Sequence, residues 1–176
     1  MQFRKHVFGL LAAVLMTACS DAGEPVAAPQ LAQLQGNSAL RLVKTSAVSA
    51  NAVTALIGRD GGLLTDAVNG HSLEIPRGAV SEPTYFVMGN VEKDVFVVKL
   101  LAYKASDLSP VKQFTTKPLK LRMNYTDAES VSPRRLKIVY VSDDLTQILE
   151  VLSTSVSRSY IEASISHFSI YSMAID

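Results

Sequence analysis

The fold is decided by the stretch Leu119-Lys120-Leu121-Arg122-Met123-Asn124-Tyr125. Apolar and polar side chains alternate through all seven positions. Because successive side chains of a β-strand point to opposite faces, this period of two predicts a strand with one face in a core and one toward solvent. A second stretch repeats the apolar half of the pattern at every other position: Phe96, Val98, Leu100 and Ala102. Together the two stretches predict an all-β chain.

Three further runs are rich in β-branched and aromatic residues, at 85–88, 136–141 and 148–152. Turn-forming sequences separate the runs: Arg59-Asp60-Gly61-Gly62, Asn69-Gly70, Pro76-Arg77-Gly78 and Ser132-Pro133. Short strands with frequent turns predict an antiparallel β-sandwich over residues 53–176, and about 120 residues suffice for a two-sheet core. Only 143–150 competes as a short helix. The same phase places five aromatic residues mostly in the core: Tyr85, Phe86, Tyr103, Tyr140 and Tyr160.

The N-terminus has the pattern of an export signal. Arg4 and Lys5 precede an apolar run at 7–16, and Thr17-Ala18-Cys19 ends it with small residues. This pattern predicts a signal peptide over residues 1–18, because the run is shorter than the roughly 20 residues that span a bilayer. A transmembrane anchor is the alternative.

Residues 15–19, Leu-Met-Thr-Ala-Cys, resemble the bacterial lipoprotein signal, in which cleavage leaves a lipid-bearing cysteine at the new N-terminus. The resemblance implies lipidation of Cys19, export, and anchoring of the protein to a membrane of the bacterial envelope. Ser20 after the cysteine favours the outer membrane or the periplasmic face. The alternative is an ordinary signal peptide with an incidental cysteine.

Residues 19–52 are rich in Ala, Ser, Gln and Pro and contain no aromatic residue. Such a composition buries little apolar surface and predicts a flexible tether that spans roughly 30 Å on average. Within it, Leu40-Arg41-Leu42-Val43 is expected to form either a short helix or a docked strand.

Composition excludes several classes of function. There are 17 basic and 16 acidic residues, so the chain lacks the basic surface of a nucleic-acid-binding protein. One cysteine allows neither an internal disulfide nor a cysteine-rich zinc site. We expect no metal and no cofactor: His71 is interpreted as a surface residue, and Asp143-Asp144 as a solvated turn rather than a calcium site.

Four motifs resemble the ZU-five domain found in zonula occludens protein, netrin receptors and ankyrins. They are Ile57-Gly58-Arg59-Asp60-Gly61-Gly62-Leu63-Leu64, Leu73-Glu74-Ile75-Pro76-Arg77-Gly78-Ala79-Val80, Phe114-Thr115-Thr116-Lys117-Pro118-Leu119-Lys120-Leu121 and Ser166-His167-Phe168-Ser169-Ile170-Tyr171. The sequence departs from the family pattern between Tyr103 and Gln113. The resemblance covers roughly residues 53–176 and implies a β-sandwich used mostly for protein–protein contact and mechanical linkage.

His167-Phe168-Ser169 is the one candidate for chemistry. A member of the family cleaves itself between the Phe and Ser of this motif. By resemblance, Ser169 is the nucleophile, His167 the base, and Phe168 supplies the carbonyl. In a continuous last strand His167 and Ser169 point inward together, although a bulge is needed to bring them within reach of proton transfer. The alternative is a purely structural end to the strand.

The sequence thus predicts a lipid-anchored, non-enzymatic envelope module for interaction or structure, with an envelope protein as its partner. A self-processing domain is one alternative, and a ligand- or polysaccharide-binding lipoprotein is another. The absence of tryptophan counts against the last.

Overall fold

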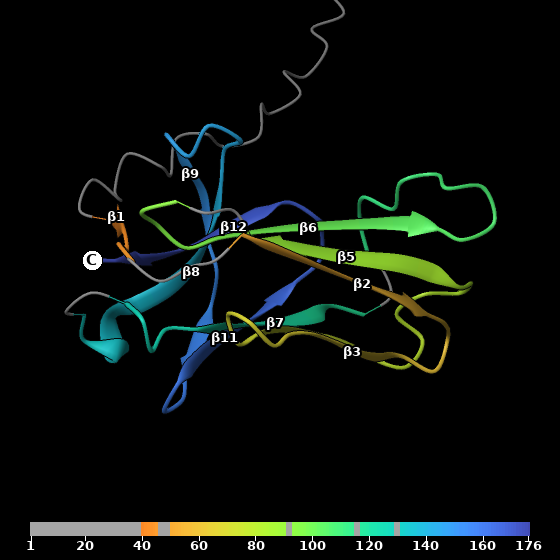
Figure 1. Cartoon of the computed structure of the whole chain (residues 1–176), viewed down its shortest axis with the longest axis horizontal. Helices are drawn as coiled ribbons and strands as arrows, with labels where there is room; N and C mark the ends of the chain where they lie inside the picture. The colour runs from red at the N-terminus through yellow and green to blue at the C-terminus, as the bar shows by residue number, and fades with distance from the viewer. Residues whose placement is uncertain (1–39, 46–49, 91–92, 115–116, 129–130) are drawn as a thin grey trace, which may run out of the picture. The chain divides into compact units, whose positions relative to one another are not determined.

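The computed structural model describes residues 40–45, 50–90, 93–114, 117–128 and 131–176, all within one compact unit. Strands joined by turns make up this part of the chain (Figure 1), which confirms the all-β prediction. In chain order the strands are β1 Arg41–Leu42, β2 Asn51–Ile57, β3 Gly62–Asp66, β4 His71–Ile75, β5 Thr84–Asn90, β6 Val97–Lys104, β7 Leu119–Asn124, β8 Leu136–Val141, β9 Ile148–Val151, β10 Thr154–Val156, β11 Tyr160–Ile165 and β12 Ile170–Ile175.

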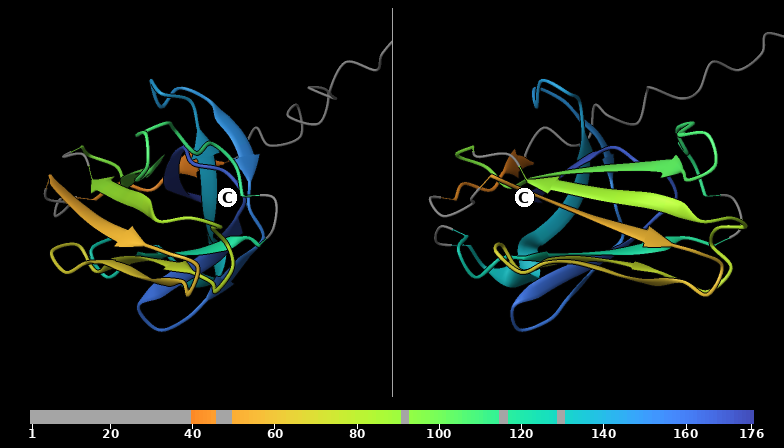
Figure 2. Two further views of the ribbon diagram at one scale, coloured as in Figure 1. Left: turned by 90° about the vertical axis from the view of Figure 1, so that its right-hand side faces the viewer. Right: turned by 45° about the vertical axis from the view of Figure 1, so that its right-hand side comes forward.

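These strands form two antiparallel sheets that pack face to face, as the turned views in Figure 2 show. Among the described residues, the larger sheet has the order β2-β5-β6-β12-β8-β9, with β1 beside β12. The smaller sheet has the order β10-β11-β7-β4-β3. The predicted antiparallel β-sandwich is therefore confirmed.

The alternating stretch that begins at Leu119 forms β7, in the middle of the smaller sheet. Leu119, Leu121 and Met123 are fully buried, whereas Lys120 and Arg122 lie half-exposed on the outer face. The run from Phe96 to Ala102 supplies the opposite wall of the same core from β6. Both stretches are buried on one face because sheet packing removes from water the apolar side chains that share that face.

The last strand, β12, is buried on both faces. Tyr171 and Met173 point into the core between the sheets, whereas Ile170 and Ala174 belong to a smaller apolar cluster on the other side. Leu40 and Leu42 pack against this second cluster. A strand with two buried faces shows a continuous apolar run rather than alternation, and Ser172 is accommodated because its hydroxyl donates to the Phe96 carbonyl.

The expected boundary of the sandwich at residue 53 is wrong. Arg41 and Leu42 pair with the end of β12, beyond the point where the β6 pairing stops, and the Val43 amide donates to the Met173 carbonyl at 2.9 Å. Of the two alternatives for residues 40–43, the docked strand is confirmed. The sheet includes this segment because β12 would otherwise leave backbone groups unpaired. Residues 19–39 and 46–49 of the expected tether lie outside the described residues, as does the expected signal peptide.

Two glycines of the ZU-five-like motifs sit in adjacent turns at one end of the sandwich. Gly61 has φ +78° and Gly78 has φ +79°, a region that other residues enter at a cost. A Cβ on Gly61 would lie 2.4 Å from the Ile75 carbonyl oxygen, and the Gly78 amide donates to the Arg59 carbonyl at 2.7 Å. The two motifs are therefore one structural unit in space.

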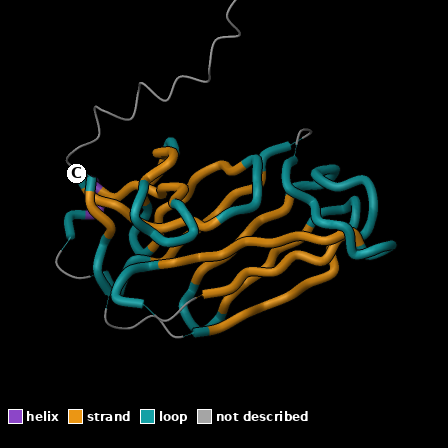
Figure 3. The backbone as a smooth tube through the Cα atoms, turned by 90° about the horizontal axis from the view of Figure 1, so that it is seen from above, coloured by secondary structure: helices purple, strands orange, loops and turns teal. Residues whose placement is uncertain are grey.

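Two expectations about local structure need correction. Residues 143–150 are not helical: a turn leads into β9, and among the described residues the one helical piece is a 3-10 turn at Pro133–Arg135 (Figure 3). Of the five aromatic residues expected mostly in the core, Phe86 is fully buried and Tyr85 is 36% exposed. The remaining three, Tyr103, Tyr140 and Tyr160, are half-buried. In the part of the chain that is described, no helix is long and apolar enough to cross a membrane.

Candidate functional site

The His167-Phe168-Ser169 motif lies where the chain crosses from one sheet to the other. β11 belongs to the smaller sheet and β12 to the larger, so the expectation of one continuous last strand is wrong. The crossover is held by backbone hydrogen bonds with the segment before β7: the Phe114 amide donates to the Ser166 carbonyl at 2.7 Å, and the Phe168 amide to the Lys112 carbonyl at 3.1 Å. The chain leaves the first sheet because β12 is paired on both sides in the second.

His167 is held by three side chains rather than by Ser169. Its Nε2 lies 3.4 Å from the Glu150 carboxylate, and its Nδ1 lies 3.3 Å from the Tyr171 hydroxyl. That hydroxyl also donates to the His167 carbonyl at 2.8 Å. The Tyr140 ring packs edge-on against the imidazole at 5.0 Å. Both ring nitrogens thus face polar partners other than the Ser169 hydroxyl.

Phe168 and Ser169 differ in their surroundings. The Phe168 ring packs against the rings of Phe114 and Phe86, with centroid distances of 4.7 and 5.8 Å, so it anchors the crossover to the core. The Ser169 carbonyl accepts from the Leu100 amide at 2.9 Å. Among the described residues, no hydrogen bond joins the Ser169 hydroxyl to His167. The structure therefore does not bring together the base and the nucleophile that self-cleavage needs, and that activity stays a prediction.

A buried polar cluster joins the two sheets where β2 begins and β3 ends, at the ends of these strands away from the glycine turns. The Asp66 carboxylate is fully buried and accepts from three asparagine amides: Asn51 at 2.6 Å, Asn69 at 2.8 Å and Asn90 at 2.6 Å. The Val68 amide donates to the same carboxylate at 2.9 Å. Burial by itself raises the pKa of Asp66, but the hydrogen bonds from Asn69 and Asn51 hold that pKa below its usual value. The charged carboxylate of β3 therefore links the smaller sheet to β2 and β5 of the larger sheet through hydrogen bonds.

His71 belongs to the same end of the sandwich, and its interpretation as a surface residue is wrong. It is 1% exposed and pairs with Asp66 across β3 and β4. Its Nδ1 accepts a hydrogen bond from the backbone amide of Asn124 at 3.0 Å, whereas its Nε2 is buried without a hydrogen-bond partner. Burial lowers the pKa of His71 to about 4, against the opposing pull of Asp66 and Asp127. The imidazole is therefore neutral near pH 7.

Sequence reasoning missed this cluster, although one signal could have found it. Asp66 follows Leu64 by two positions, His71 precedes Leu73 by two, and Asn90 follows Met88 by two. In a strand, residues two apart share a face, so each polar residue had to point inward. Buried polar side chains need partners, which makes a mutual cluster the expected outcome.

A cavity of about 590 Å³ lies beside the glycine turns at the other end of the molecule. Ala79, Val80 and Phe114 form its apolar wall, and Arg59, Glu82 and Lys104 are at its polar side. Lys104 donates to Glu82 at 2.9 Å, and this contact lowers the pKa of Glu82 and raises that of Lys104. These two charges are directed at each other, whereas no ion pair is found for Arg59 among the described residues.

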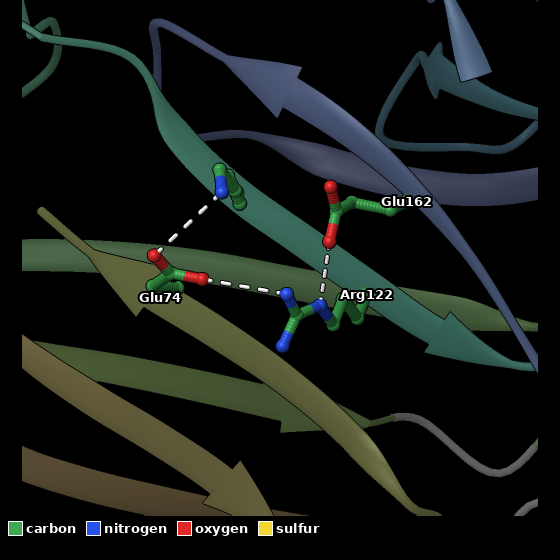
Figure 4. A network of polar contacts seen from close by, with 4 residues as sticks. Glu74, Arg122 and Glu162 are labelled. Carbon is green, nitrogen blue, oxygen red and sulfur yellow. Dashed lines mark hydrogen bonds and ion pairs between the residues drawn. The ribbon is translucent and has the colours of Figure 1, made fainter. Parts of the chain in front are cut away.

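The outer faces of the two sheets differ in character. On the smaller sheet, Arg122 of β7 lies between Glu74 of β4 and Glu162 of β11 and forms ion pairs with both, at 3.4 and 2.5 Å (Figure 4). Cross-strand charges thus occupy the middle of that face, whereas Leu63 on the edge strand β3 is 57% exposed. On the larger sheet, a row of residues across β2, β5 and β6 is instead apolar and aromatic. Leu56 lies directly opposite Tyr85, and Tyr85 lies directly opposite Tyr103.

The next row on this face pairs Val87 with Leu101, both half-buried. We call these five residues, Leu56, Tyr85, Val87, Leu101 and Tyr103, the outer strip. Leu56 is 55% exposed and Tyr85 36%. Aromatic residues are enriched in protein–protein interfaces because they cover a large area at low entropic cost. The outer strip is therefore the best candidate for a binding surface.

Two residues or segments singled out from the sequence remain, Cys19 and the turn at Asp143-Asp144. Cys19, the expected lipid attachment point, lies outside the described residues. Asp144 accepts from the Ser142 hydroxyl at 2.6 Å and from the Thr146 amide at 3.1 Å, as expected of a self-contained turn. In the described segments, no group of three His, Cys, Asp or Glu side chains is placed to hold a metal ion.

The fold and these surfaces define an all-β sandwich that has an apolar outer strip on one sheet and ion pairs in the middle of the outer face of the other. The sequence matches no model of a known protein family, and it matches no curated protein. The ZU-five resemblance of the four motifs therefore stays a prediction.

Proposed function

We propose that this chain is a lipid-anchored β-sandwich of the bacterial cell envelope that serves as a non-enzymatic interaction or structural module. The observation that carries the proposal is the outer strip. The middle of the smaller sheet's outer face carries ion pairs, as expected of a surface that meets only water. The retention of leucine and tyrosine on the other face has an explanation if a partner covers them.

A loop next to the outer strip supports the same function. Leu108 is 64% exposed and has φ +59°, which costs a residue with a Cβ roughly 1–2 kcal/mol. The loop follows Tyr103 and is closed by the Ser109 amide, which donates to Asp107 at 2.8 Å. Strained residues cluster where a structure presents a side chain for function. Leu108 is therefore a second apolar contact for the partner.

The rival proposal, self-cleavage between Phe168 and Ser169, has less support. Its base must accept a proton from the Ser169 hydroxyl, and His167 is instead directed at Glu150 and Tyr171. The positive φ angles among the described residues lie elsewhere, so the backbone carries no such strain at this bond.

Two cellular experiments test the two parts of the proposal. The full chain is expressed in its own cells with a photoreactive phenylalanine analogue in place of Tyr85 or, as a control, of Ser164, which is exposed on the charged face. We expect a discrete adduct with an envelope protein from position 85 and none from position 164. We also expect Cys19→Ala to move the protein from the membrane fraction to the soluble fraction.

Two results would contradict the proposal. Equal adducts from both positions, or none from position 85, would remove the outer strip as a binding surface. Retention of Cys19→Ala in the membrane fraction would remove the lipid anchor.

A further inference from the structure

The edge strand β2 lacks the features that keep a sheet edge free of partners. β2 is the terminal strand of the larger sheet and pairs with β5 on one side; among the described residues no strand pairs with its other side. Its seven residues, Asn-Ala-Val-Thr-Ala-Leu-Ile, include no charge and no proline. Natural sheets protect an exposed edge with charges, proline, bulges or a short strand, because the unpaired backbone groups otherwise recruit another strand.

The other terminal strands are protected in these ways. β10 has three residues, and β9 has four, with Glu150 on it and a register irregularity beside it. β3 is five residues long and ends at Asp66, which is held in the polar cluster. β2 is thus the longest terminal strand described and the one without a protective feature.

The core next to β2 is also incompletely covered. Val53 and Ala55 point inward from β2 but remain partly exposed. Their counterparts on β5, Phe86 and Met88, are fully buried. An apolar seam therefore runs along the edge of the sandwich, and a further strand paired with β2 would cover it.

We propose that a second copy of this chain fills this position, with the two β2 strands paired antiparallel about a two-fold axis at Thr54. This inference rests on the proposed interaction function and names one partner for it. The register keeps all seven residues paired: Asn51 lies opposite Ile57, and Val53 opposite Ala55. Odd-numbered residues lie opposite odd-numbered residues in this register, so the side chains that point into the core of one copy meet those that point into the core of the other. The core therefore continues across the two-fold axis.

Charge favours this occupant. Two copies of one strand bring the same net charge to a single interface, so a charged edge would repel its own copy. The absence of charge from β2 removes that penalty. The same patch on both copies forms the interface, which is the arrangement of a closed two-fold dimer. The two sheets join into one, and both outer strips then lie on a common face.

Cysteine cross-linking in the intact envelope tests the dimer. Directly opposite residues of antiparallel strands have Cβ atoms about 5 Å apart, so Thr54→Cys in the full chain is expected to give a reducible dimer. Ser164→Cys is the matched control, because residue 164 is an exposed strand position on the other sheet and gives no dimer. Thr54→Lys, which puts like charges opposite each other, is expected to be monomeric by light scattering in detergent, whereas Ser164→Lys stays dimeric.

Two outcomes would overturn the inference, and maleimide labelling of Thr54→Cys separates them. A monomer with a reactive thiol means that the edge is free. A monomer with a protected thiol means that another occupant covers the edge, either residues 19–39 of the same chain or an extended segment of another protein. In both cases an adduct from position 85 would still support the proposed interaction function, so the two proposals fail separately.

Discussion

Acidification is expected to destabilise the sandwich through His71. The imidazole is buried beside the Asp66 cluster, and a second proton would have to go onto Nδ1, the nitrogen that accepts from the Asn124 backbone amide, while the Nε2 proton has no acceptor. Burial lowers its pKa from 6.5 to about 4 in the folded chain. Below pH 6.5 the unfolded chain therefore binds a proton that the folded chain does not, and the free energy of unfolding falls as the pH falls.

The magnitude follows from the two pKa values. Between pH 7 and pH 5 the unfolded state gains most of this proton and the folded state gains little, so His71 costs about 2 kcal/mol of stability. The loss grows to roughly 3 kcal/mol near pH 4 and then levels off, because the folded imidazole also protonates there. The pKa of Asp66 is held below its usual value, so its charge does not change over the upper part of this range.

Urea denaturation of the full chain at pH 7, 6 and 5 measures this effect. His71→Asn is the informative variant, because an asparagine oxygen can still accept from the Asn124 amide while the side chain no longer titrates. The variant is less stable overall, but its stability should fall by about 2 kcal/mol less than that of the native chain between pH 7 and 5. A native stability that is flat over this range, or an unchanged slope in the variant, would refute the reasoning.

Two further predictions concern the turns and the crossover. Gly61→Ala should destabilise the protein by roughly 2–4 kcal/mol, because its φ is +78° and the added Cβ would lie 2.4 Å from a carbonyl oxygen. Gly58→Ala, which meets nothing within 4 Å, should change stability by less than about 1 kcal/mol in the same melt; similar losses in both would show that the turn is not strained. Intact-mass analysis should find the native chain and Ser169→Ala equally uncleaved after Phe168, and a shortened native chain beside an intact variant would establish self-cleavage.

The strands could be predicted because their signal is local. The alternation in β7 and β6 reflects burial on one face, and the glycine turns mark where the strands end. The sequence of segment 40–43 predicts a helix and a strand equally well, because a short apolar run has no periodicity that separates the two. It became a strand because β12 had unpaired backbone groups to offer it.

The candidate sites depended on contacts between distant segments. His167 and Ser169 are two residues apart, which predicts proximity in a strand. The chain instead leaves one sheet for the other at this point, and residues 17 and 4 positions away hold the imidazole. The asparagines around Asp66 come from three segments of the chain, and no sequence motif brings them together.

The sequence by itself determined that this chain is a two-sheet β-protein, because the period of two along a strand is a property of the backbone and does not depend on its neighbours. The tertiary structure alone decided what the polar residues do. The strand pairings placed His71 in the core, bound Asp66 to three amides, directed His167 at Glu150 and Tyr171 and left β2 at an open edge. The physical reason is that hydrogen-bond partners and solvent exposure are set by which strands become neighbours, and that choice is made by the whole chain at once.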